Sequence, residues 1–199
     1  MGRTSLQLFL KKLNFLLSNL SEELLNQQKN HSAVPDECRV LRLARPPKDF
    51  LEKQNVLAIQ LEKEFELSSE DKRTNPPHLS VWVDSLTTPE QAYSFLEENS
   101  LRKLVLRLEV EKIRTTEGNS EEASYSGLLD VIWVYLFQDI DCQFRDSRPG
   151  ADGHCGITGL DEKSAPDGLT KHQKKLLRKD LRSKLAEIAS KNCFLIYSN

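Results

Sequence analysis

The sequence predicts an α+β protein with a mostly antiparallel sheet of about six strands, helices packed on one side of the sheet, and an N-terminal amphipathic helix. Three observations favour this fold class. Apolar residues recur at helical spacing near both ends of the chain, several segments between them alternate with period two, and no internal repeat of solenoid length occurs. With 199 residues and 38% hydrophobic side chains, the chain can form one modest core beneath a heavily charged surface.

The first element is an amphipathic helix at residues 4–28, whose leucine-rich stripe runs from Leu6 to Leu24. The polar segment that follows contains Pro35 and is typical of a linker. We therefore divide the chain into an N-terminal helical segment at residues 1–30 and a single α+β domain at residues 38–199. The stripe either packs on this domain or binds a protein partner.

Alternation of apolar and polar residues predicts strands in the first half of the domain. These strands are expected at residues 39–45, 55–67, 78–83 and 103–113. A helix precedes the last of them and runs to about Asn99, because Thr88 and Gln91 can form a capping box with Pro89 in the first turn.

The second half of the domain begins with a polar loop at residues 114–126. Residues 128–137 are apolar apart from Asp130, which predicts a central strand buried on both faces. A loop rich in aspartate and glycine follows at residues 138–153, and a short strand at residues 154–158. The chain then forms a helix with a narrow leucine stripe at residues 170–191 and a closing strand at residues 193–197.

Composition favours a soluble, cytoplasmic protein. The net charge of −2 gives no overall attraction to nucleic acid or to anionic lipid. The four cysteines form no Cys-x-x-Cys pair, and with no secretory signal we expect them to be reduced. No apolar run is long enough to predict a membrane span.

Basic residues concentrate in the predicted C-terminal helix. Between Lys171 and Lys184 there are seven basic residues and a single acid, Asp180. This segment is the expected contact for an acidic or nucleic-acid partner, with a purely solvated face as the alternative. No aromatic residue stands among the basic ones, so the helix has no platform on which bases could stack.

Two histidines open predicted strands in similar local sequences. His78 begins His-Leu-Ser-Val, which places Ser80 on the same face of its strand. His154 begins His-Cys-Gly-Ile-Thr, which places Gly156 and Thr158 on its own face and Cys155 on the opposite one. Two imidazoles that titrate near neutral pH can act as base and acid on either side of one phosphate.

These two segments resemble the motifs of the two-histidine phosphoesterases, in which histidine, an apolar residue, serine or threonine, and an apolar residue follow one another. Residues 78–81 match the pattern, whereas Cys155 and Gly156 depart from it in the second segment. The resemblance implies an α+β enzyme that cleaves cyclic phosphodiesters of RNA ends or nucleotides. His78 and His154 would be the catalytic pair, and hydroxyl groups such as those of Ser80 and Thr158 would hold the phosphate.

The segment from Arg148 to Leu160 is the richest in glycine. Gly153 and Gly156 belong to a group of four glycines within ten residues, out of eight in the chain. Successive backbone N–H groups in such a loop can bind an anion, although a tight structural turn explains the glycines equally well. Neither the P-loop nor the dinucleotide-binding pattern of glycines is present, so no cofactor is expected.

Several carboxylates, two thiols and one imidazole lie between Asp139 and Cys155, but not at the spacing of a zinc or calcium site. We therefore expect no metal.

Two functional hypotheses follow from the sequence. The first is a non-catalytic protein-interaction or regulatory module that uses the Leu6–Leu24 stripe and the basic helix. The second is a small phosphodiesterase-like enzyme that uses His78 and His154.

Overall fold

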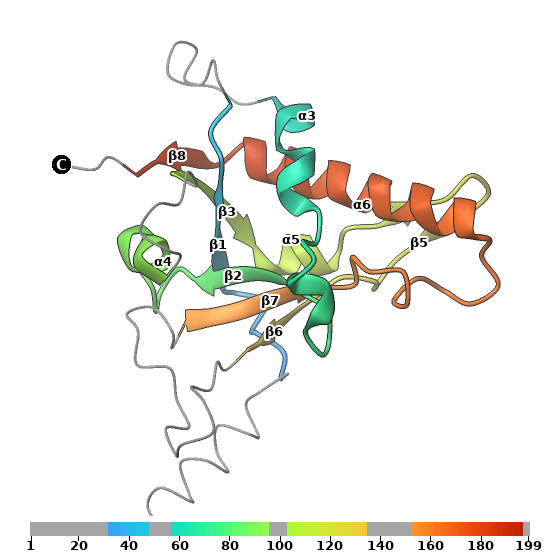
Figure 1. Ribbon diagram of the computed structural model, residues 1–199, viewed down its shortest axis with the longest axis horizontal. Coiled ribbons are helices and arrows are strands. Elements are labelled where there is room, and N and C mark those ends of the chain that lie inside the picture. Colours follow the sequence, from blue (N-terminus) through green and yellow to red (C-terminus); the bar gives the residue numbers. More distant parts are fainter. Residues whose placement is uncertain (1–31, 48–56, 96–102, 135–152, 197–199) are drawn as a thin grey trace, which may run out of the picture.

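The computed structural model describes residues 32–47, 57–95, 103–134 and 153–196. These residues form a six-stranded sheet. Helices surround the sheet (Figure 1). The strands follow the order β6-β7-β2-β1-β3-β8, and every pair of neighbours is antiparallel. A separate hairpin pairs β4 (Gly118–Asn119) with β5 (Ser124–Tyr125). The strands of the main sheet are β1 (Arg39–Ala44), β2 (Leu79–Val83), β3 (Leu104–Glu109), β6 (Asp130–Trp133), β7 (His154–Thr158) and β8 (Cys193–Leu195). The predicted α+β class and the mostly antiparallel sheet of six strands are confirmed.

The helices differ in length and in the face of the sheet that they cover. The longest, α6, lies beside α3 in Figure 1 and packs against it. The bounds of the helices, with the two 3-10 turns η1 and η2, are α3 (Ala58–Leu61), η1 (Glu62–Phe65), η2 (Asp71–Arg73), α4 (Pro89–Phe95), α5 (Val110–Arg114) and α6 (Lys171–Ser190).

The main core lies between one face of the sheet and the layer formed by α3, η1 and α6. Val40, Val81 and Ile157 point into it from the sheet, and Leu177, Leu181 and Leu185 point into it from α6. The buried Arg42 lies at the same face and donates to the backbone carbonyls of Ser80, at 2.8 Å, and Glu64, at 3.2 Å. Its guanidinium group therefore joins η1 to the sheet.

A smaller apolar cluster covers the opposite face. Leu41, Trp82 and Val105 of the sheet pack there with Ala92 of α4. The expectation that helices pack on one side of the sheet is therefore only partly right, since α4 lies on the other side. Successive side chains along a strand point to opposite faces, and both faces of this sheet carry apolar residues. Helices therefore pack on both faces.

The strand β6 is the last in the order of the described sheet, not a central strand as the apolar run at residues 128–137 suggested. Val131 and Ile132 are nonetheless buried, as expected. One reason is that residues 32–34 pair with its outer edge: the N–H of Val34 donates to Val131 at 2.8 Å, and the N–H of Trp133 donates to Ser32 at 2.9 Å. Residues 32–34, which form only an isolated β-bridge, thus cover the outer edge of β6.

Two predicted strands are wrong in whole or in part. Residues 58–65 of the expected strand at 55–67 form α3 and η1, because Leu61 and Phe65 reach the core at helical spacing while Ile59 is 78% exposed. The expected strand at residues 103–113 ends at Glu109, and the chain continues as α5, which buries Val110 and Ile113.

The other described elements agree with the sequence. The strands predicted at 39–45, 78–83, 154–158 and 193–197 are β1, β2, β7 and β8, and the helix predicted at 170–191 is α6. The predicted loop at residues 114–126 contains the β4–β5 hairpin. The N-terminal helix and residues 138–152 of the glycine-rich loop lie outside the described residues. Among the helices that are described, none combines the length and apolarity that a membrane crossing needs.

Candidate functional site

The strands β2 and β7 bring the two histidine segments together. Ser80 pairs with Gly156 and Trp82 pairs with His154. Directly paired residues of antiparallel strands point to the same side, so His78, Ser80, His154 and Gly156 share one face of the sheet. This is the face that α4 covers, opposite the main core.

The two imidazole rings lie close together, and that of His78 lies over Gly156. Their centroids are 6.3 Å apart, and the rings are inclined at 68°. Trp82 lies on the far side of His154, with 5.5 Å between the ring centroids. His78 is 5% exposed and His154 is 3% exposed. The residues form a buried row of aromatic rings in edge-to-face and tilted contact.

A backbone carbonyl group holds each imidazole by its Nδ1 atom. For His78 the carbonyl oxygen is that of Pro76, at 2.9 Å, with the hydroxyl group of Thr74 at 3.1 Å. For His154 it is that of Val134, at 3.1 Å. A carbonyl oxygen only accepts, so both rings carry a proton on Nδ1, and in the neutral form the lone pair lies on Nε2.

Gly156 is required by the ring of His78. A Cβ atom at this position would lie 2.5 Å from Cδ2 of His78. The glycine that stands in place of a hydroxyl-bearing residue in the second motif therefore makes room for the other histidine. A similar close approach explains Gly153, since a Cβ atom there would collide with the hydroxyl group of Thr87.

The remaining residues of the predicted site lie around this pair. Ser80 is partly exposed and lies opposite Gly156. Thr158 is at the other end of β7, where its hydroxyl group donates to the carbonyl oxygen of Asp130 at 3.4 Å. The structure therefore groups His78, Ser80, His154 and Gly156, with Gly153 and Thr158 at the two ends of β7.

Cys155 lies on the opposite face of β7 from His154. Its side chain is fully buried in the main core, and burial raises the pKa of its thiol far above the ordinary value. A neutral thiol away from the imidazoles cannot serve as their nucleophile.

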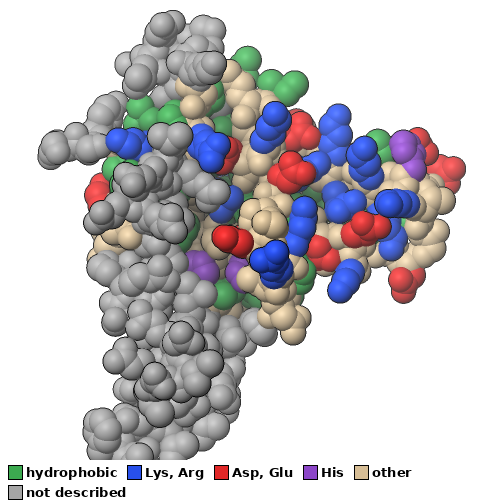
Figure 2. All heavy atoms as spheres, viewed as in Figure 1, with side chains coloured by type: hydrophobic (Ala, Val, Ile, Leu, Met, Phe, Trp, Pro, Cys, Tyr) green, Lys and Arg blue, Asp and Glu red, His purple; other side chains and the backbone are tan. Residues whose placement is uncertain are grey.

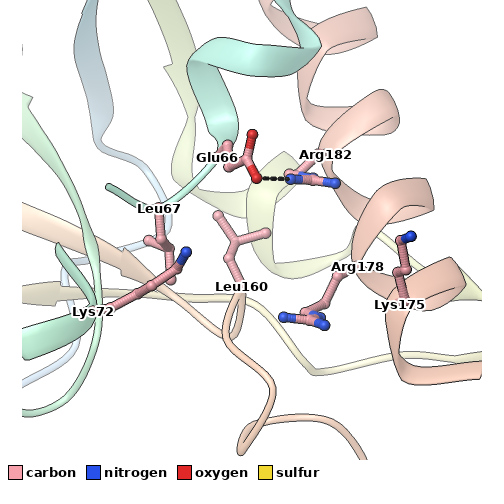
Figure 3. Close-up of a pocket in the computed structure, with 7 residues that line it drawn as sticks. All are labelled: Glu66, Leu67, Lys72, Leu160, Lys175, Arg178 and Arg182. Carbon is pink, nitrogen blue, oxygen red and sulfur yellow. Dashed lines mark ion pairs between the residues drawn. The ribbon is translucent and has the colours of Figure 1, made fainter. Parts of the chain in front are cut away.

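A second candidate site lies on the other side of the sheet, between α6 and the η1–η2 segment (Figure 3). It is a pocket of about 200 Å³. The lining residues come from three segments of the chain: Glu66, Leu67 and Lys72 near η1 and η2, Leu160 after β7, and Lys175, Arg178 and Arg182 on α6. We call this the basic pocket.

The sequence indicated only part of the basic pocket. The excess of lysine and arginine in α6 marked that helix, but Glu66 lies in the segment that was expected to be a strand, and Lys72 lies beyond that segment, in η2. No local pattern shows that this segment crosses α6. The sequence signal that could have suggested a helical conformation for this segment is Leu61 followed by Phe65, at the spacing of one helix turn.

The start of α6 is fixed by its first residues. The backbone N–H of Gln173 donates to the hydroxyl group of Thr170 at 3.2 Å, and Gln173 Oε1 accepts from the backbone N–H of Thr170 at 3.0 Å. This capping box satisfies two N–H groups at the helix start. The basic residues that follow are therefore presented on a well-defined helix.

The described residues contain no group of three or more histidine, cysteine, aspartate or glutamate side chains that could hold a metal ion. The acidic residues between Asp139 and Asp146 lie outside the described part of the chain. Comparison with protein-family models, curated proteins and solved structures found no match to the chain.

Proposed function

We propose that the protein is a non-catalytic interaction module that binds an acidic protein partner through one face of α6. This basic face consists of Lys171, Lys174, Lys175, Arg178, Lys179 and Arg182. The observation that carries the proposal is the convergence of three of these residues, with Lys72 of η2, around the basic pocket. Figure 2 shows lysine and arginine side chains gathered over the region of α6, with some acidic side chains among them.

The charge of the basic face is only partly neutralised within the molecule. Arg182 pairs with Glu66 at 3.4 Å, and Arg178 is 3.9 Å from Glu162. Among the described residues, no ion-pair partner lies within reach of Lys171, Lys174, Lys175 or Lys179. Lys184, on another side of the helix, pairs with Asp180 at 2.9 Å. A cluster of unneutralised cations attracts an acidic surface and accelerates its association.

An acidic protein fits this face better than a nucleic acid does. Proteins that bind single strands combine basic grooves with aromatic side chains on which bases stack. The segment from Lys171 to Lys184 contains no phenylalanine, tyrosine or tryptophan. Carboxylate groups need no such platform, since charge-assisted hydrogen bonds to lysine and arginine suffice.

The Leu6–Leu24 stripe is a second proposed partner surface, for an apolar face of another protein. It lies outside the described residues, so the proposal rests on the helical repeat of leucines alone.

Binding of fluorescent decaglutamate to the full chain, followed by anisotropy at low and high salt, tests the role of the basic face. We expect the double charge reversal Lys175→Glu/Lys179→Glu to weaken binding by about tenfold or more, since each lost charge contact is worth a fraction of a kcal/mol to about 1 kcal/mol. The matched control is Lys163→Glu/Lys191→Glu, which changes net charge equally at two exposed lysines outside the basic face.

A uridine oligonucleotide of equal charge provides the comparison with nucleic acid. Equal affinity for the peptide and the oligonucleotide, or equal weakening by both double variants, would show that the basic face does not select an acidic protein.

The histidine pair supports a second candidate function, a phosphodiesterase-like activity on RNA ends or cyclic nucleotides. The observation that favours it is that both imidazoles lie on one face, at 6.3 Å between centroids, with both Nδ1 atoms held by backbone carbonyl groups. One ring could then accept a proton through Nε2 while the other, when protonated, donates one.

Hydrolysis of nucleoside 2′,3′-cyclic phosphates by the purified chain tests this candidate. We expect loss of any activity in His78→Gln and in His154→Gln, and an unchanged rate in His172→Gln, which alters the exposed histidine on α6. A folded protein without hydrolysis, or with hydrolysis that survives both substitutions, would exclude the pair as the catalyst.

A further inference from the structure

The basic pocket has cations on two sides and apolar residues between them. In Figure 3, Lys72 extends from the η2 side, and Arg178 and Lys175 stand on α6 across from it, with Leu160 between. Lys175, Arg178 and Arg182 follow one another at spacings of three and four residues, so they lie along one side of the helix. A ligand in the pocket would therefore meet positive charge from two separate segments.

The pocket has a net positive charge. Its lining includes four basic residues and one acid, Glu66, so the lining carries a net charge of +3. Glu66 is bound on one side by Arg182, and the carboxylate of Glu162 is a distant partner of Arg178, at 3.9 Å. Counting Glu162 as well leaves +2. This excess matches the charge of a phosphate monoester, which is close to −2 at neutral pH.

Arg178 is oriented before any ligand binds. Its Nε atom donates to the backbone carbonyl of Lys174 at 3.2 Å, and its side chain is only 24% exposed. The two terminal nitrogen atoms of the guanidinium group take no part in that bond, and Nη2 is 3.9 Å from the carboxylate of Glu162. A guanidinium group held in this way can bind two oxygens of one phosphate side by side, which a lysine cannot do.

The size and lining of the pocket restrict what fits. Its volume of about 200 Å³ is below the range of roughly 300–1,000 Å³ that is typical of sites for whole small-molecule ligands. Leu67 and Leu160, each 5% exposed, provide an apolar wall that would contact the carbon atoms of an attached group. A single phosphorylated side chain fits these limits better than a nucleotide does.

We infer that the basic pocket binds one phosphorylated side chain, such as a phosphoserine, of the acidic protein partner. This inference rests on the proposed function and adds the chemical group that the partner presents. Arg178 would bind the phosphate by two parallel hydrogen bonds, with Lys72 and Lys175 supplying further charge. The exposed Lys171 and Lys179 would contact acidic residues on either side of the phosphorylated one.

Two labelled peptides test the inference with the full chain. One contains phosphoserine at the centre of a run of glutamates, and in the other a glutamate replaces the phosphoserine. We expect the phosphorylated peptide to bind about tenfold more tightly or better, because a phosphate offers a doubly charged, bidentate partner. Arg178→Lys should remove most of this preference while retaining affinity for the glutamate peptide.

The matched control is Lys179→Gln, on the same helix but outside the pocket lining, which should weaken both peptides by the same factor. Circular dichroism and urea unfolding of each variant show whether the fold is retained. Competition by inorganic phosphate is the last measurement. Phosphate should displace the phosphorylated peptide only at a concentration well above the dissociation constant of that peptide.

The outcomes separate the two proposals. Equal binding of both peptides would overturn the inference and leave the acidic partner in place, whereas binding of neither would overturn both. A preference that survives Arg178→Lys would exclude the bidentate role of Arg178. Inorganic phosphate that binds as tightly as the peptide would show that the pocket takes the free ion instead of a side chain.

Discussion

At the scale of single residues, Gly156 and His78 depend on each other. The ring of His78 occupies the space that a side chain at position 156 would need, as the 2.5 Å approach to a hypothetical Cβ atom shows. Buried histidines that are held by backbone carbonyl groups cannot easily turn away. The pair is therefore part of the packing of the sheet, whatever else it does.

We predict that Gly156→Ala lowers the free energy of unfolding by about 1–3 kcal/mol, the usual cost of inserting a methyl group into a packed region. In a His78→Ala background the same substitution should cost well under 1 kcal/mol, since the obstructing ring is gone. Urea unfolding of the four proteins measures this double-mutant cycle. An equal cost in both backgrounds would mean that some other contact requires the glycine.

Cys155 gives a residue-scale prediction about pH. Burial raises the pKa of its thiol from the ordinary value of 9.0, so the folded protein keeps it neutral where the unfolded chain ionises. Its contribution to stability is therefore complete below pH 9 and is lost as the pH rises beyond that value. We expect the free energy of unfolding to fall more steeply above this pH in the native protein than in Cys155→Ala, by up to about 1.4 kcal/mol per pH unit.

Chemical denaturation of the two proteins across this pH range measures the difference in slope. Alkylation of the folded protein offers an independent check, in which Cys155 should react only after unfolding, whereas Cys193 is partly exposed. Parallel stability curves for the two proteins, or rapid labelling of Cys155 in the native state, would argue against a buried neutral thiol.

Several residues of the histidine site could be identified from the sequence, but the pairing between the two strands that carry them could not be predicted. Histidine at the start of an alternating segment places His78 and Ser80 on one face, and the same reasoning places Cys155 opposite His154. That Ser80 pairs with Gly156 is a matter of register between distant strands, which local alternation does not determine. The role of Gly156 as space for a ring follows only from that register.

At the scale of elements, Arg114 joins α5 to two other segments. Its Nε atom donates to Asp130 of β6 at 2.7 Å, one terminal nitrogen donates to the carbonyl oxygen of Val131 at 3.1 Å, and the other pairs with Asp36. Burial acts to lower the pKa of this guanidinium, but hydrogen bonds and charge from Asp36 and Asp130 outweigh it and raise the pKa. The arginine thus holds the outermost described strand in place.

We predict that Arg114→Met lowers the free energy of unfolding by about 2 kcal/mol, because charge-assisted hydrogen bonds to partly buried groups are lost. The control on the same helix is Lys112→Met, which removes an exposed pair with Glu109 and should cost about 0.5 kcal/mol or less. Thermal or urea unfolding of both variants gives the comparison. Similar small costs for the two substitutions would contradict a structural role for Arg114.

Elements with one clear periodicity were the ones that the sequence predicted well. In α6 the leucine stripe and the Thr170 capping box agree with each other, so propensity and packing favour the same structure. The segment at residues 57–67 has apolar residues that satisfy both period two and helical spacing. Packing of Leu61 and Phe65 beneath α6 decides in favour of the helix, and that contact lies far away in sequence.

At the scale of the whole molecule, the two candidate sites occupy opposite faces of one sheet. The histidine pair lies on the face covered by α4, and the basic pocket lies between α6 and the η1–η2 segment on the other face. The two sites are nonetheless linked through the segment after η2, since the hydroxyl group of Thr74 lies 3.1 Å from Nδ1 of His78.

The fold class followed from the sequence because seven alternating or apolar segments, six of which contain strands, and a long amphipathic helix are sufficient evidence for it. The strand order β6-β7-β2-β1-β3-β8 did not follow, because β7 lies beside β2 across a long stretch of chain. The apolar run around β6 suggested a central strand, whereas residues 32–34 cover its edge by a short bridge. Such cover depends on tertiary contacts that no local pattern reveals.

Carbodiimide cross-linking of decaglutamate to the full chain, with mass spectrometry of the adducts, tests most directly whether the basic face binds acidic partners. We expect adducts at Lys72, Lys175 and Lys179, and their loss at high salt, because screening weakens exposed charge contacts. Exposed Lys112 and Lys191 provide internal references elsewhere on the surface. Adducts spread evenly over all of these lysines, or unaffected by salt, would contradict the proposal.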